Sequence, residues 1–169
     1  MTTEGSEAVV RVGVPADTEG VLQVQRRSPG RSYTRRFRHH IEQAIADPSS
    51  LLVVATADDE LIAWAMTSYF DHADGSAPAG YYLMGITVVP EFRRRGVATK
   101  LVQVRLDWIR QRDRRAYFFT NTSNELSIRL HERVGFREIE RGAQFRGVPF
   151  DGGQGVLFSI QLPEPSHTR

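Results

Sequence analysis

Cysteine is absent from the 169 residues, so disulfides, thiolate nucleophiles and thiolate metal ligands are excluded. Lysine is nearly absent as well: lysine and arginine together number 22, and Lys100 is the only lysine, which leaves 21 arginines. No apolar run approaches the ~20 residues that a membrane-spanning helix needs. The polar start MTTEGSEA lacks the pattern of a signal peptide. We therefore expect a cytoplasmic protein with no membrane partner and no bound metal.

The composition is that of one soluble domain, with 40% apolar and 25% charged residues. No repeat, low-complexity tract or internal linker divides the chain. We expect a flexible N-terminus over 1–7, a single domain over 8–162 and a flexible tail over 163–169.

Positive charge is concentrated in residues 26–40, which hold six arginines, two histidines and no acid. Such a cluster can be solvated surface, or its field can steer an anionic ligand. It lies outside any recognisable nucleic-acid motif, so a nucleic-acid partner is not expected.

The order of elements predicts an α/β domain with a mixed sheet. Expected strands cover 8–13, 51–57, 61–70, 81–89, 116–120, 137–145 and 156–162. Expected helices begin at 15 and cover 34–46, 97–112 and 124–134. In the third helix, one buried stripe is expected to contain Val97, Leu101, Val104 and Trp108.

The strongest candidate site lies between the strand 81–89 and the helix that follows it. The turn Arg93-Arg94-Arg95-Gly96-Val97-Ala98 leads directly into that helix. The first N–H groups of a helix lack internal acceptors and can bind a pyrophosphate. Gly96 removes the Cβ that would hinder a close approach of the backbone. The alternative is an ordinary connection with a solvated arginine run, since the turn is neither a Walker loop nor a dinucleotide fingerprint.

Two linked motifs resemble those of the GNAT superfamily of acetyl-CoA-dependent N-acetyltransferases. Residues 88–98 match V-x-P-x-x-R-x-x-G-x-A, which resembles the family's acetyl-CoA motif R/Q-x-x-G-x-G/A. Residues 124–136 resemble its N-x-x-A-x-x-L-Y-x-x-x-G-F. The resemblance follows the element order over 8–162. It implies an α+β fold with a mixed, mainly antiparallel twisted sheet of six to seven strands, flanked by about four helices.

The resemblance also implies a set of residues that bind acetyl-CoA. The backbone of Ile86, Thr87 and Val88 is expected to pair with the pantetheine arm. The turn that holds the pyrophosphate is expected to comprise Arg93, Arg94, Arg95, Gly96, Val97, Ala98 and Thr99. Asn124 is expected to hydrogen-bond the cofactor, although a simple helix N-cap is an alternative role for this asparagine.

His131 occupies the position where the family usually has the tyrosine that protonates the leaving thiolate. Histidine titrates near neutral pH, so His131 can replace that tyrosine as the general acid. The alternative is that it only packs, and water protonates the thiolate. The spacing puts His131 on one helix face with Asn124 and Ser127, expected to look along the cofactor, with Leu126 and Leu130 facing the core.

No general base can be assigned from the sequence. Relatives often place a glutamate on the two central strands, but 81–89 and 116–120 contain no acid. Glu91 is expected to point to solvent, and Asp71 and His72 lie in a loop that can border the substrate.

The resemblance places the acceptor amine between the first two helices and the last hairpin, with Tyr33, Phe37 and Phe150 as the expected substrate-binding residues. The basic segment 26–40 repels a polycationic aminoglycoside. It suits an amine that carries a carboxylate or phosphate, or an acidic peptide N-terminus.

We therefore expect transfer of the acetyl group of acetyl-CoA to a primary amine, favouring a small molecule, by direct attack in a ternary complex. The alternatives are a protein or peptide N-acetyltransferase and a non-catalytic acyl-CoA-binding module. A homodimer is compatible with the sequence.

Overall fold

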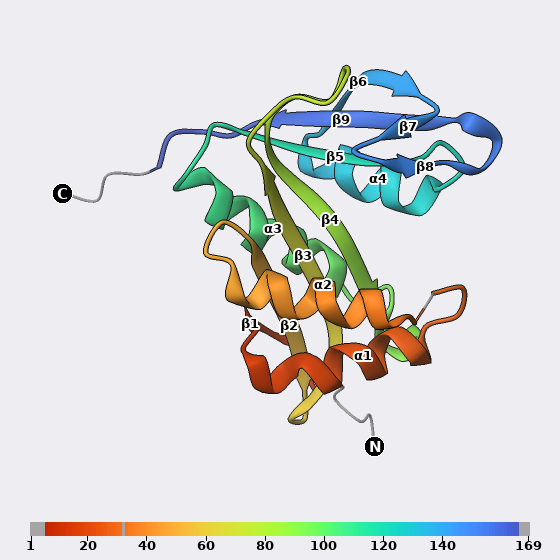
Figure 1. Cartoon of the computed structure of the whole chain (residues 1–169). Coiled ribbons are helices and arrows are strands. Elements are labelled where there is room, and N and C mark those ends of the chain that lie inside the picture. Colours follow the sequence, from red (N-terminus) through yellow and green to blue (C-terminus); the bar gives the residue numbers. More distant parts are fainter. Residues whose placement is uncertain (1–5, 32, 166–169) are drawn as a thin grey trace. The chain divides into compact units, whose positions relative to one another are not determined.

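Figure 1 shows the computed structural model, which describes residues 6–31 and 33–165. The chain forms two compact units: one comprises 1–66 and 85–104, and the other comprises 67–84 and 105–169. Of the predicted flexible ends, residues 1–5 and 166–169 lie outside the described residues. Residues 6–8 and 162–165 have no regular secondary structure.

The strands form a sheet with the order β1-β2-β3-β4-β5-β9-β6. Their bounds are β1 Val9–Val12, β2 Leu51–Ala57, β3 Glu60–Phe70, β4 Gly80–Val88, β5 Arg115–Asn121, β6 Arg137–Gly142 and β9 Gly155–Gln161. Strand β4 is parallel to β5, whereas the pairs β1–β2, β5–β9 and β6–β9 are antiparallel. The predicted mixed, mainly antiparallel sheet is confirmed.

Four α-helices occur among the described residues. They are α1 Thr18–Arg27, α2 Arg35–Ala46, α3 Val97–Arg110 and α4 Glu125–Val134. Elements β3, β4 and α3 each contribute residues to both units.

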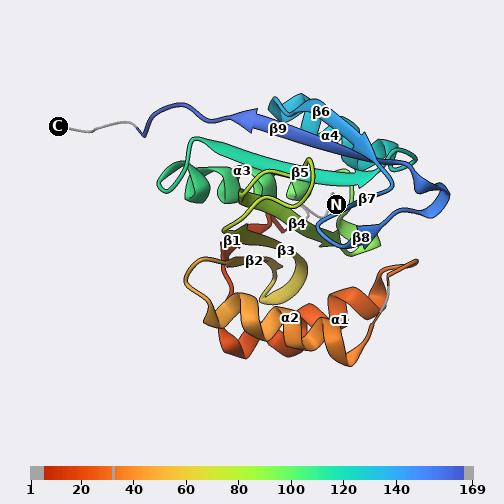
Figure 2. The same cartoon turned by 45° about the horizontal axis from the view of Figure 1, so that its top comes forward.

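In the first unit, α1 and α2 lie side by side next to β2 (Figures 1 and 2). A short 3-10 helix, η1 (Pro15–Asp17), leads into α1, which buries Val21, Leu22 and Val24. Helix α2 begins after Thr34, whose hydroxyl oxygen accepts a hydrogen bond from the Phe37 amide at 3.1 Å. This N-cap adds a side-chain acceptor for an amide that also lies 3.0 Å from the Thr34 carbonyl, and it fixes the predicted helix start.

In the second unit, the side chains of β5 alternate between two faces, as the pleat of a strand requires. Phe118 contacts His131 of α4. Tyr117 and Phe119 instead belong to an aromatic cluster with Phe145. The predicted strand 137–145 is in fact interrupted: β6 ends at Gly142, and a separate hairpin is built from β7 (Gln144–Phe145) and β8 (Val148–Pro149). The 3-10 helix η3 (Asp151–Gly153) then leads to β9.

Helix α3 corrects the predicted stripe. Val97 and Leu101 are buried as expected, but Val104 and Trp108 are only half-buried. The stripe instead continues to Arg105, which is 1% exposed. Arg105 lies eight residues after Val97, so the helical period keeps it on the same face. The prediction considered only apolar residues for the buried stripe and therefore omitted Arg105.

Candidate functional site

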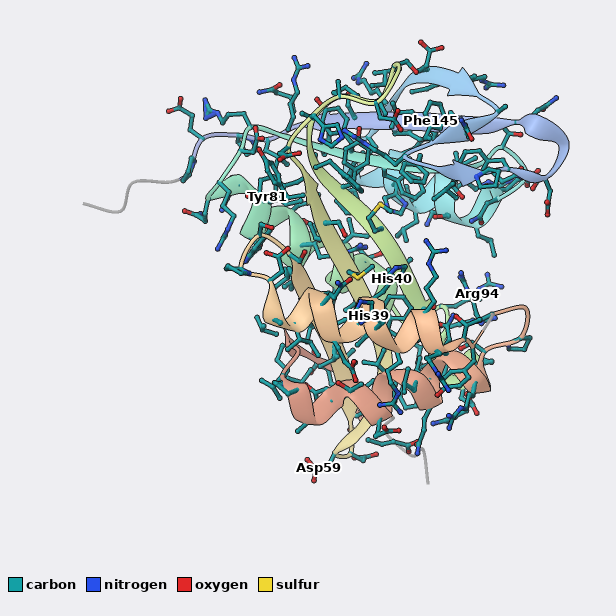
Figure 3. The ribbon with its side chains drawn as sticks, in the orientation of Figure 1. His39, His40, Asp59, Tyr81, Arg94 and Phe145 are labelled. Carbon is teal, nitrogen blue, oxygen red and sulfur yellow. The ribbon has the colours of Figure 1, made fainter. Side chains whose placement is uncertain are left out.

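The turn between β4 and α3 contains two residues with a left-handed backbone conformation. After β4, the 3-10 helix η2 (Pro90–Phe92) precedes Arg94, with φ of 61°, and Gly96, with φ of 79°. Glycine adopts this region freely, whereas a non-glycine residue there stores strain of about 1 kcal/mol, which functional sites often retain. Arg94 is exposed at this turn (Figure 3).

Helix α3 begins at the same point, and its first amides point out of the helix toward this turn. The first helical hydrogen bond runs from the Lys100 amide to the Gly96 carbonyl, at 3.1 Å. The preceding amides, of Val97, Ala98 and Thr99, therefore have no acceptor within the helix and can donate to an anion. An ideal Cβ built on Gly96 meets no heavy atom within 4 Å, so the space over this glycine is open. These features fit a pyrophosphate.

Arg93 and Arg95 of the turn make different contacts. The Arg93 Nε donates to the Val88 carbonyl at 3.1 Å. The Arg95 guanidinium lies over the Phe92 ring, 5.0 Å from its centroid. A hollow of about 190 Å³ beside the turn is lined by Phe92, Arg95, Val97, Lys100 and residues 6–8.

The end of β4 is held by α1. The Thr87 side chain is buried, and its hydroxyl donates to Gln25 Oε1 at 3.3 Å. The Ile86 carbonyl accepts from Arg31 Nη2 at 3.4 Å. The register of β4 with β5 comprises Tyr81 and Tyr82, so Ile86, Thr87 and Val88 lie beyond the part of the strand that pairs with β5.

His131 is a core residue of the second unit. It is 1% exposed, and its ring stacks on Phe118 with the centroids 3.6 Å apart and the planes inclined by 3°. Its Nδ1 lies 2.7 Å from the Ser127 carbonyl oxygen, a geometry that suits donation from an Nδ1–H. No described residue gives the buried Nε2 a hydrogen bond.

The surroundings keep this imidazole neutral. Burial lowers the pKa of His131 to about 4, and the charge of Arg105 contributes further in the same direction. Burial also lowers the pKa of Arg105, to about 9, so this guanidinium stays charged at neutral pH. Of the two roles considered for His131, these contacts favour packing over proton donation.

The face of α4 that carries His131 is the opposite of what the apolar pattern predicts. Leu126, which was expected in the core, is 83% exposed, whereas His131 is buried. Phe118 and Phe136 both contact the imidazole ring, so the aromatic partners of His131 determine which face is buried. The expectation for Leu126 was wrong.

Asn124 caps α4. Its Oδ1 accepts from the Ser127 amide at 3.4 Å, and its Nδ2 donates to Thr120 Oγ1 at 3.0 Å. The side chain is exposed. The N-cap role is confirmed, and the cofactor contact stays a prediction.

The acids and histidine considered as bases are solvated. Asp71 and His72 form an exposed pair, with 2.6 Å between Oδ1 and Nδ1, and this hydrogen bond lowers the pKa of Asp71. Glu91 is exposed as expected, and it pairs with Arg27 at 3.4 Å. None of these contacts marks one of the three as a base.

The predicted acceptor residues belong to different units. Tyr33 and Phe37 flank the N-cap of α2 in the first unit. Tyr33 is 40% exposed, and the Arg26 guanidinium lies 4.2 Å from the centroid of its ring. The centroid of the Phe37 ring lies 5.3 Å from that of Trp64. Phe150 belongs to the second unit, where it packs against Phe119 and Phe145.

Two arginines were not singled out in the sequence. Arg31 lies within the basic segment, but nothing in its neighbours distinguishes it from the other arginines. Arg146 follows β7, and its guanidinium lies over the rings of Phe70 and Tyr82, at 4.5 and 5.2 Å from their centroids. The adjacent Gly147 suggests a turn there, but no local pattern reveals the distant aromatic rings.

Within the described residues, no helix is long and apolar enough to cross a membrane. The same residues contain no group of three or more histidine, aspartate or glutamate side chains that could hold a metal ion.

Comparison with known proteins finds one matching family model and two kinds of related protein. The model of the acetyltransferase (GNAT) family matches residues 18–136. An aminoglycoside N(6')-acetyltransferase type 1 of Acinetobacter haemolyticus is 31% identical over 109 residues, which are 62% of this chain and 74% of that protein. N-alpha-acetyltransferase 30 of Schizosaccharomyces pombe is 35% identical over 68 residues, 40% of this chain and 45% of that protein.

Solved structures share the fold at low sequence identity. The ribosomal-protein-S18-alanine N-acetyltransferase of Escherichia coli has a TM-score of 0.73 at 16% identity, covering 96% of this chain and 99% of that one. Arabidopsis thaliana NAA60 in complex with acetyl-CoA has a TM-score of 0.71 at 21% identity, covering 92% and 98%. The family model spans more than half of the chain and includes both the Gly96 turn and α4. The chain therefore belongs to the GNAT family of acetyltransferases.

Proposed function

We propose that this acetyltransferase moves the acetyl group of acetyl-CoA to a primary amine of a small molecule, by direct attack in a ternary complex. The observation that carries the proposal is the turn at Gly96. There, left-handed backbone, open space and the first amides of α3, those of Val97, Ala98 and Thr99, coincide within one turn of helix. Such a cluster of donors suits the pyrophosphate of coenzyme A.

The strand that leads to the turn supplies the second part of the proposed cofactor site. The backbone of Ile86, Thr87 and Val88 would pair with the pantetheine arm. Thr87 is held by Gln25, which fixes the strand before the cofactor arrives. Asn124 would add a contact from the start of α4, where its side chain is exposed.

Proton transfer in this proposal does not depend on His131. The leaving thiol has a pKa of about 8.5, so its thiolate is a weak enough base to leave without a side-chain acid and to be protonated by solvent afterwards. A histidine with a pKa of about 4 carries almost no proton to give at neutral pH. We assign His131 the role of holding α4 against Phe118, and the rival role of general acid is tested separately.

The small-molecule acceptor is supported by the curated relatives, whose names give aminoglycosides as their substrates. A peptide acceptor is the second candidate. It is supported by the similarity to N-alpha-acetyltransferase 30 over 68 residues. Tyr33, Phe37 and Phe150 would contact the acceptor in either case.

The test is release of coenzyme A from acetyl-CoA, followed with a panel of small amines and a panel of peptides of varied N-terminal sequence. We expect turnover with small amines. Turnover with peptides alone would reverse the order of the two candidates. Tight binding of acetyl-CoA without turnover on either panel would identify a non-catalytic acyl-CoA-binding module.

A further inference from the structure

The turn between α1 and α2 is built against the end of β4. Ser28 is 2% exposed and its hydroxyl donates to the Val24 carbonyl at 2.7 Å, which ends α1 inside the core. The Arg31 amide then donates to the Ser28 carbonyl at 3.3 Å, and Gly30 supplies the left-handed residue between them, with φ of 75°. This short turn directs Arg31 toward the Ile86 carbonyl.

Arg31 differs from Arg27 and Arg38, the two arginines of the same basic segment that form ion pairs. Arg27 and Arg38 each form ion pairs with two glutamates. The partners are Glu60 and Glu91 for Arg27, and Glu19 and Glu42 for Arg38. Among the described residues, no carboxylate pairs with Arg31, and its recorded side-chain contact is a carbonyl at the long distance of 3.4 Å.

A second guanidinium increases the local positive charge. Arg93 is held by the Val88 carbonyl, two residues along β4 from the carbonyl that Arg31 contacts. Arg31 is exposed as a residue, but the surrounding chain removes part of the solvent from its guanidinium group. This desolvation lowers the pKa of Arg31, and repulsion from Arg93 lowers it further. The acid next to Arg93, Glu91, is paired with Arg27 at 3.4 Å. Two neighbouring cations favour binding of an oxyanion, and guanidinium groups bind carboxylates and phosphates through paired N–H donors.

We propose that Arg31, supported by the charge of Arg93, binds a carboxylate or phosphate group on the acceptor, so that the preferred acceptors are amines that carry such a group. This inference rests on the proposed acetyl transfer and specifies its substrate class. Because Arg31 contacts the part of β4 assigned to the pantetheine arm, an anion bound there would hold the acceptor next to the thioester. An anionic acceptor would also be attracted by the basic segment 26–40, which repels a polycationic acceptor.

The experiment compares kcat/KM for matched acceptors: glycine, β-alanine and 4-aminobutyrate against their carboxamides, and phosphoethanolamine against ethanolamine. The variants are Arg31→Gln and, as a matched control, Arg36→Gln. Arg36 is an exposed arginine in the first turn of α2, within the same basic segment. Differences in amine basicity between acceptors cancel, because each variant is compared with the wild type on the same acceptor.

For the anionic acceptors, we expect Arg31→Gln to lower kcat/KM by about 10-fold or more, the usual scale for a charge-assisted hydrogen bond. For the neutral acceptors the change should stay within about 3-fold, and Arg36→Gln should behave as the wild type on both.

Three results would overturn the inference. They are an equal loss on anionic and neutral acceptors, a wild-type preference for the neutral acceptors at equal concentrations of unprotonated amine, and a rise in the KM for acetyl-CoA alone, which would place a cofactor phosphate at Arg31. The absence of turnover on every acceptor would count against the proposed acetyl transfer itself.

Discussion

The imidazole of His131 lies flat on the ring of Phe118, with their centroids 3.6 Å apart. This contact separates the two roles considered for His131, because a phenyl ring can stack in the same place but cannot carry a proton. We expect His131→Phe to keep kcat within about 3-fold of the wild type, with unchanged affinity for acetyl-CoA. Steady-state kinetics with a saturating amine are the measurement.

If His131 were the general acid, its replacement by phenylalanine would lower kcat by about 10²-fold. His131→Tyr would then restore much of the rate, because tyrosine is the family's usual donor at this position. His131→Ala is a weaker test, since emptying a buried site costs about 2–5 kcal/mol and can unfold α4.

The low pKa of His131 predicts a pH dependence of stability. In the folded protein this pKa is about 4, below the ordinary value of 6.5. As the pH falls from 6.5 to 4, the unfolded chain binds a proton that the folded chain excludes. The free energy of unfolding should therefore decrease across this window, by roughly 3 kcal/mol from this group. Above pH 6.5 the group contributes no pH dependence.

Denaturant titrations at several pH values measure this effect. His131→Phe should lose this part of the acid sensitivity. Hydrogen bonds to Arg11 lower the pKa of Asp17 below its ordinary value of 3.8, so the titration of Asp17 changes stability at pH values below the window of His131. Equal slopes for the wild type and His131→Phe between pH 4 and 6.5 would show that the imidazole is not buried in its neutral form.

Arg146 joins two loops of the second unit. Its Nη2 donates to the Pro78 carbonyl, which also accepts from the Tyr82 hydroxyl at 2.6 Å, and its guanidinium covers the Phe70 ring. Arg146→Ala should lower the free energy of unfolding by about 1–3 kcal/mol, because a cation–π contact and a charged hydrogen bond are lost together. Hydrogen exchange should also become faster in residues 71–80.

The control is Arg129→Ala. Arg129 is exposed and pairs with Glu125 at 3.4 Å, a surface pair worth at most about 0.5 kcal/mol. If both variants have the same denaturation midpoint, the contacts of Arg146 do not stabilise the unit.

The elements that follow local rules could be predicted from the sequence. Thr34 caps α2 where expected, and the turn before α3 places Gly96 in the left-handed region that glycine adopts freely. The helix cap and the glycine turn both depend on residues adjacent in the chain, so the local sequence is sufficient to predict them.

Features set by distant residues could not be predicted. The helix pattern assigned Leu126 to the core, but Leu126 is exposed and His131 is buried against Phe118, which lies on another element. Arg105 is buried although its charge argued for solvent. The position of Arg31 likewise depends on β4, 55 residues away.

The central claim is that the turn at Gly96 binds acetyl-CoA, and calorimetric titration of acetyl-CoA into Gly96→Val tests it most directly. Gly75→Val is the control, because Gly75 also has a positive φ, of 56°, and open space around a built Cβ. Valine at either position strains the backbone, but only at Gly96 would its side chain crowd the pyrophosphate. We expect wild-type affinity in Gly75→Val and no measurable binding in a folded Gly96→Val. Unchanged affinity in Gly96→Val would contradict the claim and place the cofactor elsewhere.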